Sequence, residues 1–141
     1  MCAIRRSPED EHHTCLPQRR GPEHKHLGGS GFEPRQAHPL THYCVVREDL
    51  DRGVLAAQLI HAAANSTPFE LPPDTRAVAL AARDEAHLRF IEAKLRHAGI
   101  DHRAIREPDP PWCGALMAIG IVPVADRSAV RHVTRSLKLL R

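Results

Sequence analysis

The sequence predicts an α/β domain in which a mixed sheet lies between two layers of helix. Short strand-like runs alternate with longer amphipathic segments, several of the runs are apolar throughout, and two runs are joined by a loop alone. Strands that are apolar on both faces are typical of a sheet covered by helices on both sides. A loop connection allows its two strands to run antiparallel. We therefore expect a three-layer α/β/α sandwich with a four-stranded mixed sheet.

The domain opens with a strand and a helix. The run HYCVVRE, residues 42–48, is short and Val-rich and predicts a buried first strand. A helix is predicted from Val54 to Asn65, where Leu55, Leu59 and Ala62 share one face.

A second strand and a second helix follow. The strand is predicted over RAVALAA, residues 76–82. Asp84 and Glu85 then open a helix, because negative charge suits the positive end of the helix dipole, and Gly99 stops it. The predicted inward face of this helix consists of apolar residues three or four positions apart: Leu88, Ile91, Leu95 and Ala98.

The last part of the chain predicts two strands and a final helix. Residues 100–105 form the third strand, and the Pro-rich segment EPDPPW, residues 107–112, forms a loop because proline suits neither a helix interior nor a central strand. The apolar run at 114–122 is the fourth strand. A last helix is predicted at 126–137, and its inward residues are Val130, Val133 and Leu137. The predicted order is β-α-β-α-β-β-α.

The first forty residues differ from the rest. They are dense in His, Pro, Gly, Arg and Glu and include the linker-like LGGSGFEP. Such a segment buries too little apolar surface to offset its ordering entropy. We expect a disordered tail over residues 1–40 and a folded domain over 41–141. No metal is expected, because the His and Cys residues of the tail lack the spacing of a closed site.

The bulk composition excludes other classes of protein. The net charge of +3, from 20 basic and 17 acidic residues, is too small to indicate a nucleic-acid partner by itself. No apolar run approaches the roughly 18 residues of a membrane span, and the first residues lack the apolar stretch of a secretory signal. We expect a cytoplasmic location and no membrane partner.

Several segments together resemble a known family. They are, in order, YCVVREDL (43–50), GVLAAQLIHAA (53–63), ARDEAHL (82–88), ALMAIGIVP (115–123) and SLKLL (136–140). The chain is similar over about a hundred residues to the peptidyl-tRNA hydrolase type II family, whose first helix carries Ala-Ala-Gln-x-x-His-Ala. The REPD loop, residues 106–109, resembles a divergent side branch of that family.

The resemblance implies a function and a site. It implies hydrolysis, without a cofactor, of the ester that joins a peptide to tRNA, by a protein that is often a homodimer. The residues that match the family pattern are Gln58 and His61 on the first helix and an acidic loop with Glu107 and Asp109. Such chemistry needs a placed water, a group that takes its proton, and donors for the oxyanion.

The chain also departs from the family pattern. Val54 stands where the family has a lysine before Ala-Ala-Gln, and Arg47 and Arg52 are the cations that could replace it, although a guanidinium and an ammonium are not equivalent. His61 and Gln58 could equally be structural residues, with no chemistry. A non-catalytic tRNA-binding or adaptor module is therefore the alternative function, and an enzyme acting on another small substrate is a weaker one.

A basic stripe is predicted on the last helix. Arg127, Arg131, Arg135 and Lys138 recur every three or four residues, opposite the apolar face. Such a stripe could follow a phosphate backbone, so these arginines, with Arg47 and Arg52, are the candidate RNA contacts. The alternative is an ordinary solvated helix face.

Overall fold

The structure, a computed structural model, describes residues 38–141. The predicted tail therefore lies outside the described residues except for its last three positions. The elements of the described part are, in order, β1 (Thr41–Arg47), α1 (Arg52–Asn65), β2 (Arg76–Ala82), α2 (Glu85–His97), β3 (His102–Glu107), β4 (Ala115–Val124), α3 (Ser128–Thr134) and β5 (Lys138–Leu139). No helix in this part is both long and apolar enough to cross a membrane.

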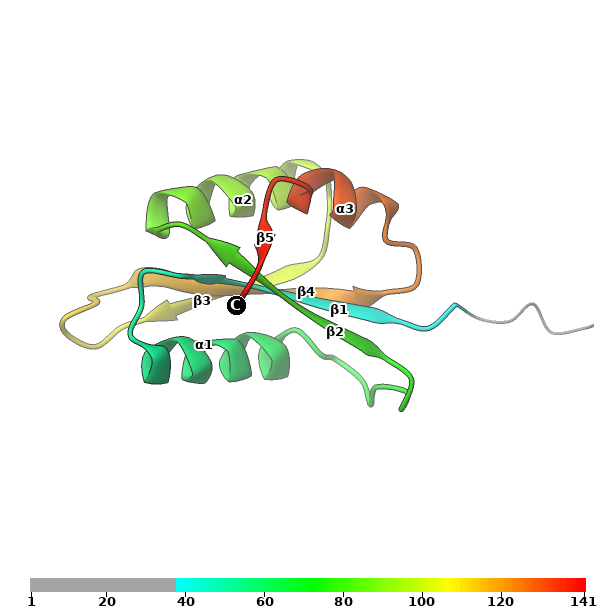
Figure 1. The fold of residues 1–141 in the computed structure, drawn as a ribbon, viewed down its shortest axis with the longest axis horizontal. Helices are drawn as coiled ribbons and strands as arrows, with labels where there is room; N and C mark the ends of the chain where they lie inside the picture. Colours follow the sequence, from blue (N-terminus) through cyan, green and yellow to red (C-terminus); the bar gives the residue numbers. More distant parts are fainter. Residues whose placement is uncertain (1–37) are drawn as a thin grey trace, which may run out of the picture. The chain divides into compact units, whose positions relative to one another are not determined.

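The strands form one mixed sheet in the order β3-β4-β1-β2-β5. β1 and β2 are parallel, whereas β4 runs antiparallel to both β1 and β3. Helix α1 covers one face of the sheet, and α2 and α3 cover the other (Figure 1). The predicted three-layer α/β/α sandwich is confirmed, with five strands instead of four.

The fifth strand replaces the end of the predicted last helix. That helix was expected to reach residue 137, but α3 ends at Thr134. The chain then turns back, and Lys138 and Leu139 pair with Ala81 and Leu80 of β2. Strand β2 presents a row of unpaired backbone groups at the edge of the sheet, and β5 pairs with those near its carboxyl end, at Leu80 and Ala81. The predicted position of Lys138 on the helical stripe is therefore wrong.

Other strand and helix boundaries differ from the prediction by up to two residues, and two of these differences are informative. Glu107, expected in the Pro-rich loop, is the last residue of β3 and pairs with Ala115. Strand β4 continues past its predicted end through Pro123 to Val124. The pairing of β1 with β4 shifts register between Thr41 and Tyr43, opposite this end of β4, which is the kind of irregular position where a strand accepts proline.

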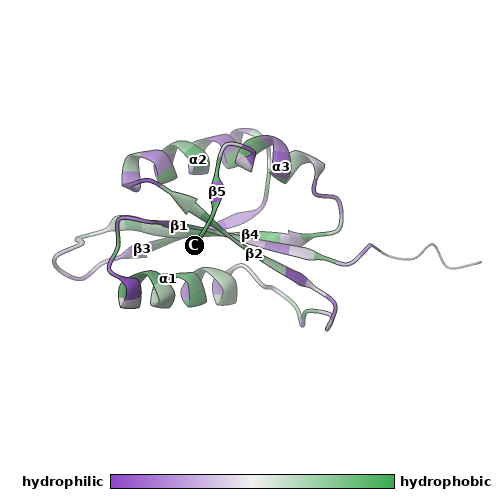
Figure 2. Ribbon diagram, in the orientation of Figure 1, coloured by the Kyte–Doolittle hydropathy of each residue, from purple (hydrophilic) through white to green (hydrophobic). Residues whose placement is uncertain are grey.

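A hydrophobic cluster lies on each side of the sheet. On the α2 side, Leu88, Ile91 and Leu95 are fully buried, as predicted, whereas Ala98 is exposed because the helix ends at His97. On the other side, Ala62 of α1 is buried and Leu55 and Leu59 pack beside it. Figure 2 shows α1 as mainly hydrophobic beyond its first residues, whereas hydrophilic residues recur along α2 and α3.

Helix α2 has defined ends that fix its register. The Asp84 side chain accepts a hydrogen bond of 2.7 Å from the backbone N–H of His87, which caps the first turn. At the other end, Gly99 has a φ of 64°, and Ile100 donates its N–H to the carbonyl oxygen of Leu95. This is the Schellman arrangement that a glycine after a helix favours. The predicted start and stop of this helix are confirmed.

Helix α1 packs very closely on β4. A Cβ atom at Gly120 would lie 2.1 Å from the carbonyl oxygen of Ala62 and 2.4 Å from Oγ of Ser66. Ser66 Oγ donates to that carbonyl oxygen at 2.7 Å and also lies 2.7 Å from Nε2 of His42. A serine has one hydroxyl proton, so His42 is the donor in the second bond. Buried polar groups thus join the end of α1 to the centre of the sheet.

The buried His42 should make the fold sensitive to mild acid. Burial lowers the pKa of His42 below its ordinary value, so the unfolded chain binds the proton first as the pH falls. The free energy of unfolding should then decline below about pH 6.5 and level off once the folded-state pKa is passed. Urea titrations at several pH values should show a smaller decline for His42→Asn, which cannot titrate. Equal declines in both proteins would contradict this assignment.

Candidate active site

Charged residues gather where three strands end. β1, β2 and β3 point the same way, because β1 is parallel to β2 and both β1 and β3 are antiparallel to β4. Their last residues, Arg47, Ala82 and Glu107, therefore lie at one end of the sheet, together with the start of β4. We call this the carboxyl edge. Ligand sites of α/β proteins commonly lie at such an edge.

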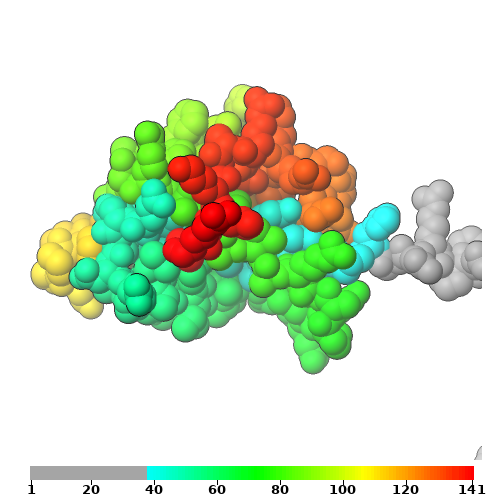
Figure 3. Space-filling model, viewed as in Figure 1, coloured from blue at the N-terminus to red at the C-terminus, as the bar shows by residue number. Residues whose placement is uncertain are grey.

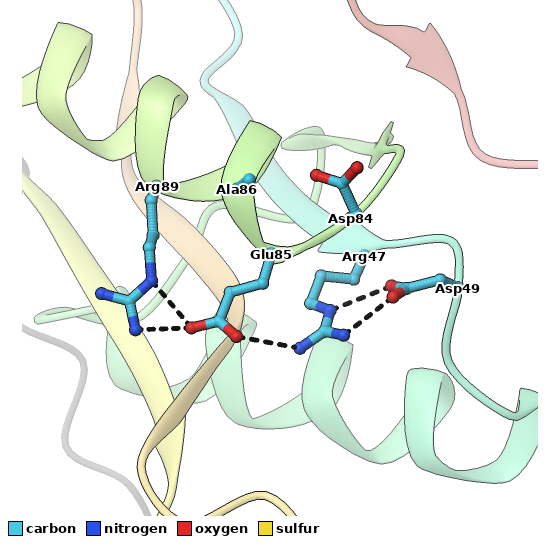
Figure 4. Close-up of a pocket in the computed structure, with 6 residues that line it drawn as sticks. All are labelled: Arg47, Asp49, Asp84, Glu85, Ala86 and Arg89. Carbon is cyan, nitrogen blue, oxygen red and sulfur yellow. Dashed lines mark hydrogen bonds and ion pairs between the residues drawn. The ribbon is translucent and has the colours of Figure 1, made fainter.

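Arg47 is the centre of a chain of ion pairs at the carboxyl edge. Its Nε and Nη2 atoms donate to the two carboxylate oxygens of Asp49 at 2.9 and 2.8 Å, and its Nη1 lies 3.6 Å from Oε2 of Glu85. Arg89, one helical turn beyond Glu85, pairs with Oε1 of the same carboxylate (Figure 4). The Arg47 side chain is only 10% exposed. The two carboxylates thus fix its position and neutralise its charge.

The protonation states in this network are stabilised by hydrogen bonds. The pKa of Asp49 is lowered, chiefly by its bond from Arg47. The pKa of Glu85 is lowered first by the backbone N–H of Leu116, which donates to Oε1 at 3.0 Å, and then by its arginine partners. Both carboxylates therefore remain charged at neutral pH. They line a hollow of about 470 Å³, together with Arg47, Asp84, Ala86 and Arg89.

Two predicted site residues meet on the α1 side of the sheet. Gln58 is 4% exposed, and its Nε2 donates to Oε2 of Glu107 at 3.0 Å. The other end of the amide, Oε1, is buried and has no hydrogen-bond partner among the described residues. The orientation of the amide is fixed by chemistry, because a carboxylate can accept from the NH₂ group but would repel the carbonyl oxygen. Gln58 therefore holds Glu107 while keeping one acceptor free.

His61 and Val54 lie on the same flank of α1 as Gln58. His61 is three residues further along the helix and Val54 is four residues before Gln58, which are the spacings that place side chains on one flank. His61 is exposed, and no hydrogen bond joins it to Gln58 or Glu107 within the described residues. Val54 packs beside the apolar cluster, where the family pattern has a lysine. The structure thus brings Gln58 and Glu107 into contact but leaves His61 at the surface.

Trp112 connects the Arg47 network to the α1 side. It belongs to the loop that begins after Glu107, and its ring centroid lies 5.5 Å from Cζ of Arg47. The ring also packs against the same apolar cluster as Val54. A guanidinium above an indole ring is a favourable contact. The loop also holds Asp109, which is exposed and whose carbonyl oxygen accepts the N–H of Trp112 at 3.0 Å.

The predicted RNA contacts lie in three separate places. Arg52, the first residue of α1, lines a hollow of about 590 Å³ that Arg141 also lines, and Figure 3 shows the C-terminal residues against this part of the chain. Arg131 is on the exposed face of α3, and Arg127 and Arg135 flank the helix at its two ends. Arg47 is enclosed by carboxylates, as described above. The structure does not gather these arginines into one patch.

The pairing of Arg47 with Glu85 was not predicted from the sequence. The sequence pointed to Arg47 as a replacement for the family's lysine or as an RNA contact, whereas it lies in a hollow whose carboxylates are Asp49, Asp84 and Glu85. A signal was available. Glu85 follows the strand parallel and adjacent to β1, so both residues must reach the same edge of the sheet.

Comparison with known protein families identifies the family of the whole domain. The sequence profile of the family described as "Peptidyl-tRNA hydrolase PTH2" matches residues 40–140. A search of the curated proteins finds no match to the chain. The profile covers all the helices and strands described above, and with them both the ion pairs of Arg47 and the contact between Gln58 and Glu107. The chain therefore belongs to the peptidyl-tRNA hydrolase PTH2 family.

Proposed function

We propose that this protein releases peptides from peptidyl-tRNA by hydrolysing the ester that joins them. Membership of the family supports this reaction. The observation that carries the proposal is the contact between Gln58 and Glu107, in which a buried amide holds a carboxylate and keeps a free acceptor beside it. A buried acceptor without a partner costs about 1–3 kcal/mol. Oε1 has almost no exposed surface, so a water can donate to it and recover that cost only after the side chains around it move apart.

In the proposed reaction Glu107 acts as the general base. The water bound between Gln58 Oε1 and Glu107 gives a proton to the carboxylate while its oxygen bonds to the ester carbonyl carbon. The bond from that carbon to the ribose oxygen then breaks, and the ribose oxygen takes the proton that Glu107 received from the water, which restores the carboxylate. His61 is the surface group on the same flank and is proposed to donate to the developing oxyanion. Asp109 is exposed, two residues after Glu107 in the same loop, and is proposed to orient the substrate.

Peptide release from a labelled peptidyl-tRNA tests the proposal. The wild-type protein should release the peptide, and both Gln58→Ala and His61→Ala should be slower by at least about tenfold, since each removes a group that acts in the transition state. A substitution at Glu70, an exposed residue of the loop before β2, provides a control. Release that is equal in wild type and His61→Ala, or absent in all proteins, would exclude the proposed chemistry.

A specific observation favours a second candidate, a non-catalytic tRNA-binding module. Val54 stands at the family's lysine position and packs beside the core, so no ammonium is present there. In that case tRNA should bind without turnover, and the affinity should fall steeply with salt. Neutralising Arg127, Arg131 and Arg135 together should then weaken binding; unchanged binding would exclude these arginines as the contact.

Three further expectations stay predictions. A cytoplasmic location, a homodimer and activity without a cofactor are all implied by the family or the composition. Sedimentation of the purified protein would test the homodimer, and activity after chelation would test the absence of a metal requirement.

A further inference from the structure

A second hollow lies between α2 and α3, on the face of the sheet opposite α1. Its volume is about 310 Å³, and the two helices contact each other beside it. Its lining residues are Phe90, Ala93, Lys94, His97, Ala98, His132 and Val133. None of them takes part in the candidate active site. The hollow therefore belongs to a different surface of the molecule.

Phe90 gives this hollow an exposed aromatic wall. Its side chain is 59% exposed, although α2 has a well-formed inner face of Leu88, Ile91 and Leu95. Because those three residues share the buried face of the helix, residue 90 lies on the opposite face and cannot reach the core. Small side chains at Ala93 and Ala98 leave room beside the ring. An exposed aromatic residue above such a hollow is the usual form of an anchor pocket for an apolar side chain.

The rim of the hollow is basic. Lys94 lies across the Phe90 ring, with Nζ 5.4 Å from the ring centroid, and forms no ion pair within the described residues. His97 and His132 are the other ionisable lining residues, and no carboxylate is among them. The two carboxylates of α2, Glu85 and Glu92, are both engaged by arginines. The surface thus combines apolar walls with uncompensated positive charge.

We propose that this hollow binds an acidic amphipathic segment of another protein. An apolar side chain of the partner fills the space between Phe90 and Val133, and carboxylates on either side of it meet Lys94 and the two histidines. Laying a helix with an apolar stripe into a groove between two helices is a common mode of peptide recognition. Complementary charge then selects the partner and speeds association.

Two other occupants fit the surface less well. A symmetric contact between two copies of this patch would bring two sets of its positive charges into one interface with no lining carboxylate to meet them, which opposes that dimer. RNA binding through base stacking needs an open ring face, whereas Lys94 lies over Phe90. The small apolar floor suits an aliphatic side chain.

The test uses a labelled helical peptide with Leu at positions i, i+3, i+4 and i+7 and Glu at the exposed positions. The full-length protein should bind it, and binding should weaken at high salt. Phe90→Ala and Lys94→Glu should each reduce the affinity by about tenfold or more, the effect of losing an anchor residue. Phe69→Ala, which removes another exposed aromatic residue (47% exposed), should leave the affinity unchanged. Both variants alter surface positions, and a thermal melt checks their folding.

Four results would overturn the proposal. They are no binding, equal binding of a peptide with Lys in place of every Glu, equal binding by the Phe90→Ala variant, and a Phe90-dependent self-association or RNA binding that the peptide does not displace. Peptide release from peptidyl-tRNA should be unaffected by Phe90→Ala. Peptide binding and peptide release are measured separately, so either proposal can be disproved without affecting the other.

Discussion

Replacing Glu107 by Gln should slow peptide release by about a hundredfold or more, because general-base catalysis contributes roughly 10²–10⁴ to such reactions. The substitution keeps the shape of the side chain. Its amide oxygen can still accept from Gln58 Nε2, a bond that is 3.0 Å long in the wild type. The loss should therefore appear in the rate of chemistry, measured in single turnovers, with little change in thermal stability or in tRNA binding.

Asp109→Asn makes this experiment decisive. Asp109 is in the same loop but is exposed. If Glu107 is the base, the Asp109 variant should lose much less activity. A larger loss for Asp109→Asn than for Glu107→Gln would move the base to Asp109 and contradict the role given to the Gln58 contact.

Gly120→Ala should destabilise the domain by about 3 kcal/mol, at the upper end of the usual cost of overpacking a core. The added methyl group would lie 2.1 Å from the carbonyl oxygen of Ala62, which is backbone and cannot rotate away. Helix α1 must then move off β4, and the bond from Ser66 to the same carbonyl is strained with it. Chemical denaturation gives the change in the free energy of unfolding.

Gly53→Ala is the matched control. Gly53 lies in the first turn of α1, and a Cβ there would meet no atom within 4 Å. Because alanine favours the helix over glycine, this variant should be as stable as the wild type or more stable by up to about 1 kcal/mol. A Gly120→Ala protein as stable as Gly53→Ala would show that α1 is not tightly held on the sheet.

Local patterns predicted most of the fold. Helix α2 could be predicted closely, because everything that defines it lies in one segment. Its buried residues Leu88, Ile91 and Leu95 recur with the helical period, and Asp84 and Gly99 mark its ends. Strand β5 could not be predicted, because two residues are too few to show the alternation of a strand. They form one only because the edge of β2 is open for pairing. Such pairing depends on the whole sheet.

In the candidate site, too, some features could be predicted from the sequence and others could not. The resemblance identified Gln58 and Glu107 separately, 49 positions apart, but only the folded chain shows that they touch. The order of the strands could place Arg47 and Glu85 at one edge of the sheet, but the ion pairs by which Asp49 and Glu85 enclose the arginine appear only in the folded chain. Residue types can be predicted from a motif, whereas ion-pair partners depend on how strands and helices meet.

The enclosed arginine constrains how this protein can be redesigned. Among residues 38–141, Arg47 is the cation paired with Asp49, and Glu85 uses its other oxygen to accept from Arg89 and from the N–H of Leu116. Removing only the arginine would leave the carboxylates of Asp49 and Glu85 near each other without the cation that both of them contact, and like charges repel. Positions 47, 49 and 85 therefore have to be exchanged as a set, so that an engineer who wants a new charge at this edge must begin with three substitutions.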